Sequence, residues 1–242
     1  MAMLDSPSAP ARAVVTAAPH PAPGWRPGDR QRAARLDSLR TAAQDATAVA
    51  PDPARRAPIW HIPVPHERTP PPLVWLLGAH GGAGVSTLAQ LMAPAADCHR
   101  RWPAVLEGES PYVVVVARET VDGLARAHDL LRQWHCGQAG HRAHLLGLVT
   151  CAHQPKTAPK PITRYLEVIE TLAPARWRIG WQADWPITQL EDLPTWTPDH
   201  VAPSKGPDPM GAVRELGDAL IAAVRAIEYG PQPAPTSKGT LR

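Results

Sequence analysis

The apolar residues of this chain gather in short continuous runs, most of them followed by stretches in which apolar residues recur every three or four positions. Continuous apolar runs are typical of strands buried on both faces and predict strands at 73–77, 112–117, 145–151 and 177–181. The helical spacing predicts helices at about 86–96, 121–134, 162–172 and 213–227. This alternation favours an α/β fold, a doubly wound and mostly parallel sheet covered by helices.

The N-terminal part lacks this pattern. Residues 1–27 are Ala, Pro and small polar residues, which cannot bury enough surface to offset the entropy lost on ordering. Helix formers without Pro or Gly predict a weak helix at 29–48, and residues 51–72 return to Pro, as in a stiff extended linker. We therefore predict a disordered Ala/Pro/Arg-rich arm at 1–72, an α/β domain at 73–229 and a disordered tail at 230–242.

Composition narrows the class of protein. The three Cys residues are scattered, and no apolar run approaches the roughly 20 residues that cross a bilayer. The N-terminus has no basic-then-apolar signal, so we expect a cytoplasmic protein without a membrane segment. The net charge of +3 arises in residues 1–72, where nine Arg stand against six acidic residues. That arm either contacts nucleic acid or an acidic partner electrostatically or is an ordinary solvated tail.

The loop after the first predicted strand carries the candidate chemistry. Glycines let backbone N–H groups approach phosphates closely, and the start of the next helix adds its positive dipole end. In a phosphate-binding loop a Lys and a Ser or Thr then contact the phosphates and Mg²⁺. The candidate residues for binding ATP or ADP are Gly78, His80, Gly81, Gly82, Ala83, Gly84, Val85, Ser86 and Thr87. The alternative is a tight strand–helix turn that binds nothing.

The segment from His80 to Thr87 resembles the deviant Walker A loop of ParA/MinD-type ATPases, written KGGxGK(S/T)(S/T). The resemblance implies a P-loop NTPase-like fold over about 73–229, with Ser86 as the Mg²⁺ ligand. His80 stands where the family has a lysine that reaches across a dimer, and Val85 stands at the phosphate-binding lysine. The chain also resembles an actinobacterial family with a GAHGGAGxST loop, which implies a link to mobile, conjugative-type elements.

Two acidic residues of the ParA-type enzymes have no counterpart here. The strand at 112–117 is followed by Arg118 and Glu119 rather than Asp, and the segment 97–111 is too short and polar for the strands usually found there. The resemblance therefore implies an abridged domain. Arg118 or His80 could replace the missing lysine charge, although the sequence places neither at the loop.

These losses bear directly on activity. Phosphoryl transfer by P-loop enzymes depends on positioning and charge stabilisation, and losing one preorganised donor typically costs about 10²–10³ in rate. We therefore expect a degenerate P-loop protein, a pseudo-ATPase that works as a regulatory or adaptor module for a protein partner. The alternative is a weak or unorthodox ATPase that uses the loop Gly78–Thr87. A third hypothesis is DNA binding through the arm.

Other residues suggest weaker possibilities. The His and Cys residues around the third predicted strand do not have the spacing of a standard zinc site, and we interpret them as ordinary loop histidines and buried thiols. Four Trp residues lie in or after the last predicted strand, and they either replace Phe in the core or stack on a base or a partner. These four are Trp177, Trp181, Trp185 and Trp196.

Overall fold

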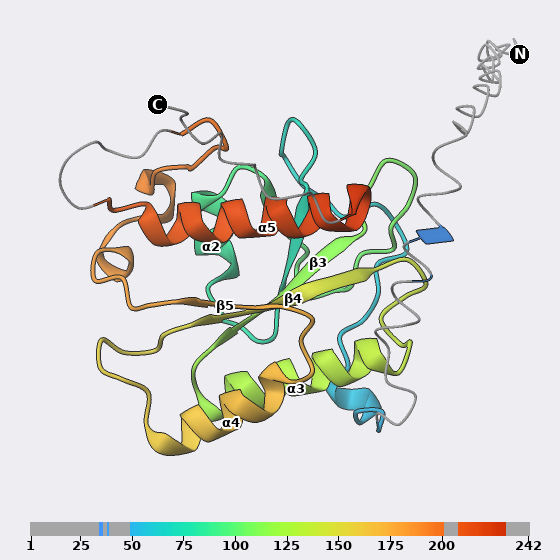
Figure 1. The fold of residues 1–242 in the computed structure, drawn as a ribbon, viewed down its shortest axis with the longest axis horizontal. Coiled ribbons are helices and arrows are strands. Elements are labelled where there is room, and N and C mark those ends of the chain that lie inside the picture. The colour runs from blue at the N-terminus through green and yellow to red at the C-terminus, as the bar shows by residue number, and fades with distance from the viewer. Residues whose placement is uncertain (1–33, 36–37, 39–48, 201–207, 231–242) are drawn as a thin grey trace, which may run out of the picture.

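The computed structural model describes residues 34–35, 38, 49–200 and 208–230. Its centre is a five-stranded, all-parallel sheet with the order β2-β1-β3-β4-β5 (Figure 1). The strands are β1 (Val74–Gly78), β2 (Ala95–Asp97), β3 (Tyr112–Arg118), β4 (His144–Cys151) and β5 (Arg176–Ile179). Strands β1 and β4 are buried throughout and β3 nearly so, as their continuous apolar runs predict.

Helices cover both faces of this sheet (Figure 1). One face carries α2 (Val85–Leu91) and α5 (Gly211–Tyr229), and the other carries α3 (Val121–His135) and α4 (Lys160–Glu170). Three short 3₁₀ helices complete the described elements: η1 (Pro53–Arg55), η2 (Trp185–Ile187) and η3 (Leu190–Asp192). The predicted α/β fold with a parallel sheet between two helical layers is therefore confirmed.

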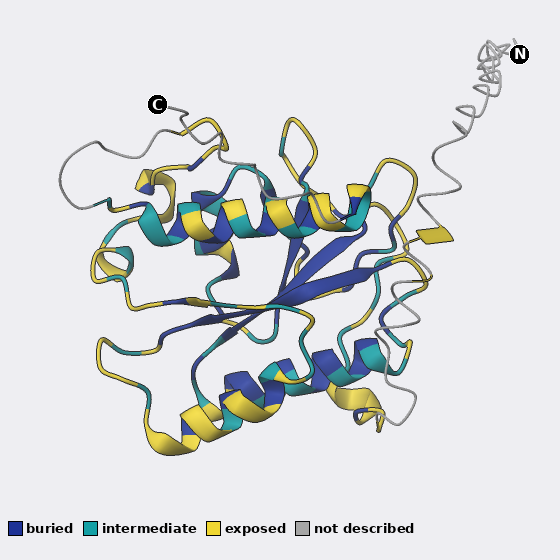
Figure 2. Ribbon diagram, viewed as in Figure 1, coloured by how far each residue is buried: buried dark blue, intermediate teal, exposed yellow. Residues whose placement is uncertain are grey.

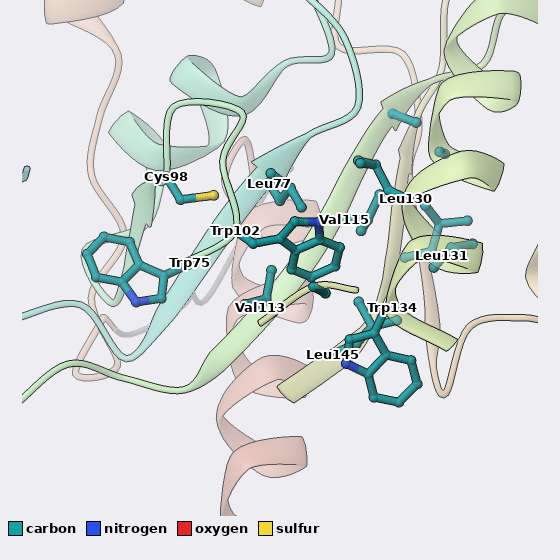
Figure 3. Packing of buried hydrophobic residues seen from close by; sticks show 14 of the residues in the cluster. Trp75, Leu77, Cys98, Trp102, Val113, Val115, Leu130, Leu131, Trp134 and Leu145 are labelled. Carbon is teal, nitrogen blue, oxygen red and sulfur yellow. The ribbon is translucent and has the colours of Figure 1, made fainter. Parts of the chain in front are cut away.

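Each face of the sheet has its own hydrophobic core, visible as buried segments on both sides in Figure 2. Large tryptophans fill both cores. Trp75, Trp102 and Trp134 are at most 1% exposed and lie on the α3/α4 side (Figure 3), and Trp196 is equally buried on the α2/α5 side. In a chain without Phe, Trp supplies the large aromatic volume of the core.

The predicted helix at 86–96 is too long, because α2 ends at Leu91. Met92 already has extended backbone, and Pro94 offers no N–H for a helical hydrogen bond. The chain instead forms β2, which pairs with Val74–Leu76 of β1. A three-residue strand is too short to show alternation, so the sequence pattern missed it.

Residues 51–72, predicted as an extended linker, pack against the α/β domain. Val64 is 2% exposed and belongs to the α3/α4 core. The N–H of Ala57 donates to Oε1 of Gln133 at 2.9 Å, and Arg55 pairs with Asp129 at 2.5 Å. The packed part of the chain therefore begins before residue 73, because apolar residues among the prolines reach the core.

The predicted helix at 29–48 falls almost wholly outside the described residues, within which Ala34, Arg35 and Ser38 are helical. Most of the predicted disordered arm lies outside them as well, and so do residues 231–242 of the predicted tail. Within the described part of the chain, no helix has the length and apolar character needed to cross a bilayer.

Candidate functional site

The topology points to one edge of the sheet. In open α/β sheets, ligands bind beyond the carboxyl ends of the strands, where the strand order reverses. Here the order reverses at β1, because β2 lies on one side of it and β3 on the other. The glycine loop follows β1 and therefore lies at this position.

The glycine loop is open at its tip. Gly82 and Gly84 have φ values of 81° and 101°, a left-handed conformation that favours glycine. A Cβ placed on Gly81 or Gly82 would meet nothing within 4 Å. The tip therefore has room for a ligand, and α2 begins directly after Gly84.

The loop position that the resemblance aligns with a phosphate-binding lysine holds a core residue. Val85 is 7% exposed and packs in the α2/α5 core, where its Cγ2 lies 3.0 Å from the position of a Cβ on Gly78. Ala83 is buried in the same core. Neither side chain reaches the open side of the loop, so any contact from these two residues to a ligand comes from the backbone.

Contacts within the chain hold the half-buried side chain of His80. Its Nε2 accepts the N–H of Arg118 at 3.2 Å, and its Nδ1 lies 2.8 Å from the carbonyl oxygen of Gly81. Together these contacts specify the neutral tautomer with the proton on Nδ1. The ring is also packed against Gly123 at the start of α3, where a Cβ would lie 2.7 Å from Nε2. The side chain thus joins the loop to the end of β3 instead of extending toward a second subunit.

Arg118 brings a cation to the loop. Its Nε donates to the carbonyl oxygen of Gly82 and its Nη1 to that of Ala152, both at 3.3 Å. Its Nη2 lies 3.8 Å from the position of a Cβ on Gly84. The sequence suggested that Arg118 could supply a positive charge but did not place it near the loop. Its position as the last residue of β3 brings it there, because the carboxyl ends of parallel strands lie at one edge of the sheet.

A cavity of about 170 Å³ opens beside Arg118. It is smaller than the about 300–1,000 Å³ of typical small-molecule pockets, so it would enclose only part of a nucleotide. Its walls combine the glycine loop, the ends of β3, β4 and β5, and the segment after β5. The lining residues are Gly84, Thr87, Arg118, Cys151, Ala152, Ile179, Gly180, Trp181, Gln182, Trp185 and Pro186.

Only some of the predicted site residues line this cavity. Gly84 and Thr87 line the cavity, whereas Ser86 is exposed outside it. Trp181 and Trp185 also line it, whereas Trp196 belongs to the core, as predicted for a Trp that replaces Phe. Stacking on a base or a partner stays a prediction.

The cavity contains a cation but no carboxylate. The nearest acidic residue in sequence, Glu119, is 5% exposed and accepts two hydrogen bonds from Arg178, at 2.5 and 2.8 Å. Thr150 donates a third at 3.2 Å. The hydrogen bond from Glu119 also raises the pKa of Arg178. This carboxylate is therefore engaged by Arg178 and Thr150, and it is not among the residues that line the cavity.

The cavity wall also holds a thiol. Burial raises the pKa of Cys151 to about 11, although the nearby Arg118 acts in the opposite direction. The thiol is therefore protonated near neutral pH and a poor nucleophile. Among the described residues, no group of three or more His, Cys, Asp or Glu side chains is placed to hold a metal ion.

Comparisons with protein-family models, curated proteins and solved structures find no match. The resemblance to ParA/MinD-type ATPases therefore stays a prediction based on the loop. The functional argument therefore rests on the carboxyl edge of the sheet, where the glycine loop, Arg118 and the small cavity lie together.

Proposed function

We propose that this chain is a degenerate ParA/MinD-like P-loop protein that binds the phosphate groups of ATP or ADP without hydrolysing them. The observation that carries the proposal is the position of Arg118, whose guanidinium lies against the glycine loop at the edge of the cavity. Arg recognises phosphate oxygens well because its planar donors match their geometry. Arg118 would supply the charge that Val85 lacks.

Other residues of the edge support the same ligand. The hydroxyl of Thr87 and the N–H groups around Gly82 and Gly84 would donate to phosphate oxygens. Trp181 and Trp185 offer aromatic surface at the mouth of the small cavity. The phosphates would occupy the cavity beside the loop, and the rest of the nucleotide would lie in the open region next to these rings.

Hydrolysis would lack its usual groups. An attacking water needs a residue that positions it, and Mg²⁺ is commonly held through a carboxylate. The lining residues include none, and Glu119 is paired with Arg178. Bound nucleotide would therefore act by stabilising one conformation, as in a regulatory or adaptor module that a protein partner recognises.

The test is titration calorimetry of the full chain with Mg-ATP and Mg-ADP, together with a phosphate-release assay. We expect binding, no phosphate release above the buffer rate, and a loss of about 10–100-fold in affinity for Arg118→Ala, since hydrogen bonds to charged groups contribute about 1.5–3 kcal/mol. The control is Arg176→Ala, which removes the same charge at the opposite end of the sheet. Absence of binding would contradict the proposal, and phosphate release abolished by Ser86→Ala or Thr87→Ala would favour the ATPase alternative.

A further inference from the structure

A second arginine lies on the other side of the glycine loop. Because β2 and β3 are the two neighbours of β1, the loops that follow them flank the glycine loop on both sides. Arg118 comes from the end of β3. Arg100 comes from the loop after β2, and its Cγ lies 3.8 Å from the position of a Cβ on Gly78.

The backbone that places Arg100 is unusual. His99 and Arg100 have φ values of 57° and 56°, in the left-handed region that non-glycine residues rarely adopt. Hydrogen bonds hold this turn: the N–H of His99 donates to Oδ1 of Asp97 at 2.6 Å, and Nε1 of Trp60 donates to the carbonyl oxygen of Cys98 at 2.9 Å. The turn brings an exposed arginine back beside the end of β1.

Neither flanking arginine has a carboxylate partner within the part of the chain that the structure describes. Among the described residues, no carboxylate lies within 4.0 Å of the guanidinium of Arg100 or Arg118. The neighbouring Arg101 differs, because its guanidinium lies over the ring of Trp60, with its Cζ 5.0 Å from the ring centroid. Arg118 thus contacts the tip of the loop at Gly82, and Arg100 lies at the start of the loop beside Gly78.

We propose that Arg100 is a second phosphate-binding residue and that this site takes a linked di- or triphosphate in preference to orthophosphate. The inference rests on the proposed function and adds a second arginine to the same site. A single phosphate at the loop would contact Arg118 and leave Arg100 without an anion. Linked phosphates would extend along the loop from Arg118 toward the side on which Arg100 lies, and a guanidinium donates well to phosphate oxygens.

The test is calorimetric titration of the full chain with orthophosphate, pyrophosphate and ADP at fixed ionic strength. The main variant is Arg100→Asn, which removes the charge and tolerates the left-handed backbone. Arg101→Asn is the matched control, and thermal unfolding checks that each variant folds. We expect wild type to bind pyrophosphate at least about 10-fold more tightly than orthophosphate. Arg100→Asn should lose most of that preference while its affinity for orthophosphate stays within about twofold, and Arg118→Ala should weaken both ligands.

Different failures have different meanings. If pyrophosphate and orthophosphate bind equally and only Arg118→Ala weakens them, the role of Arg100 is overturned and the proposed function stands. If Arg101→Asn weakens pyrophosphate as much as Arg100→Asn does, a diffuse positive field explains the binding and the inference is again overturned. If an oligothymidylate displaces pyrophosphate and depends on Arg100, the arginine belongs to a nucleic-acid surface instead. If wild type binds none of the three ligands, the proposed function fails as well.

Discussion

The two ends of the parallel sheet carry cavities of opposite character. The cavity at the carboxyl edge measures about 170 Å³ and has Arg118, Thr87 and two Trp residues in its wall. The cavity at the amino end is larger, about 260 Å³, and is lined mainly by apolar side chains: Trp134, Leu145, Leu146, Pro174, Ala223 and Ile227, together with His144.

Volume alone would favour the amino end, but the topology and the chemistry of the lining favour the carboxyl edge. Strand order reverses at that edge, and polar groups from three loops converge there. We therefore expect substitutions at the carboxyl edge to change binding, and substitutions toward the amino end to change stability alone.

The largest effect should follow from Gly147→Ala in β4. A Cβ at this position would lie 2.2 Å from the carbonyl oxygen of Ala175, a backbone atom just before β5. We expect a loss of about 1–3 kcal/mol in the free energy of unfolding, with a fall of about 2–4 °C in Tm per kcal/mol. Thermal and urea unfolding would measure it. Gly180→Ala is the control, since its Cβ would meet nothing within 4 Å, and an equal loss there would contradict the packing argument.

Val85→Lys tests whether a residue at the carboxyl edge can affect stability rather than binding, because Val85 lies in the loop but packs in the α2/α5 core. Burying a neutral polar group without a hydrogen-bond partner costs about 1–3 kcal/mol in mutational data, and the lysine would have to lose its charge or leave the core. For Val85→Lys we expect a lower free energy of unfolding in urea and no gain in ATP affinity. Ser86→Lys, at the neighbouring exposed position, should leave the free energy of unfolding nearly unchanged. If Val85→Lys is as stable as wild type and binds ATP more tightly, the loop retains a working lysine position.

His80→Gln tests the connection between the loop and β3. The variant disturbs the acceptor for the N–H of Arg118 and the contact with Gly81. A lost hydrogen bond of this kind contributes about 1 kcal/mol, so we expect a modest fall in stability. Phosphate affinity should fall as well, because Arg118 would be less well positioned. Unchanged affinity in calorimetry would show that the histidine plays no part in positioning the site.

Ala223→Met should fill part of the amino-end cavity. Ala223 is half-buried on α5 and faces that cavity, so the longer side chain gains apolar contact there. Cavity-filling substitutions commonly stabilise by about 0.5–2 kcal/mol, and we expect the low end of that range because the cavity is open at the surface. Nucleotide affinity should not change. A change in affinity would show that the two ends of the sheet are coupled.

The smallest effect concerns thiol reactivity. Burial raises the pKa values of both Cys98 and Cys151, to about 11 for Cys151. In alkylation by iodoacetamide followed by mass spectrometry, the half-buried Cys136 should therefore react first at pH 7. Labelling of Cys151 should rise roughly tenfold per pH unit below its pKa, because the thiolate is the reactive form. Pyrophosphate should slow labelling of Cys151 but not of Cys136, and rapid labelling of Cys151 at pH 7 would contradict its burial.

Much of the fold follows from local pattern. The valine run predicts a strand buried on both faces, which is β3. The three-and-four spacing predicts helices with one apolar face, which α3 and α5 pack against the sheet. Glycines between an apolar strand and a helix likewise marked the loop from sequence. By contrast, β2 and the packing of Val64 escaped prediction, because each depends on a distant partner, β1 in one case and the α3/α4 core in the other.

The chemistry of the candidate site was decided only by the tertiary structure. The sequence by itself determined most of the strands and helices and the place of the glycine loop between the first strand and the first helix of the sheet. It could not determine which cations lie near that loop, because Arg100 and Arg118 follow different strands and meet the loop only through the strand order β2-β1-β3. The carboxyl ends of parallel strands lie at one edge of the sheet, so residues that are far apart in the sequence come close together there.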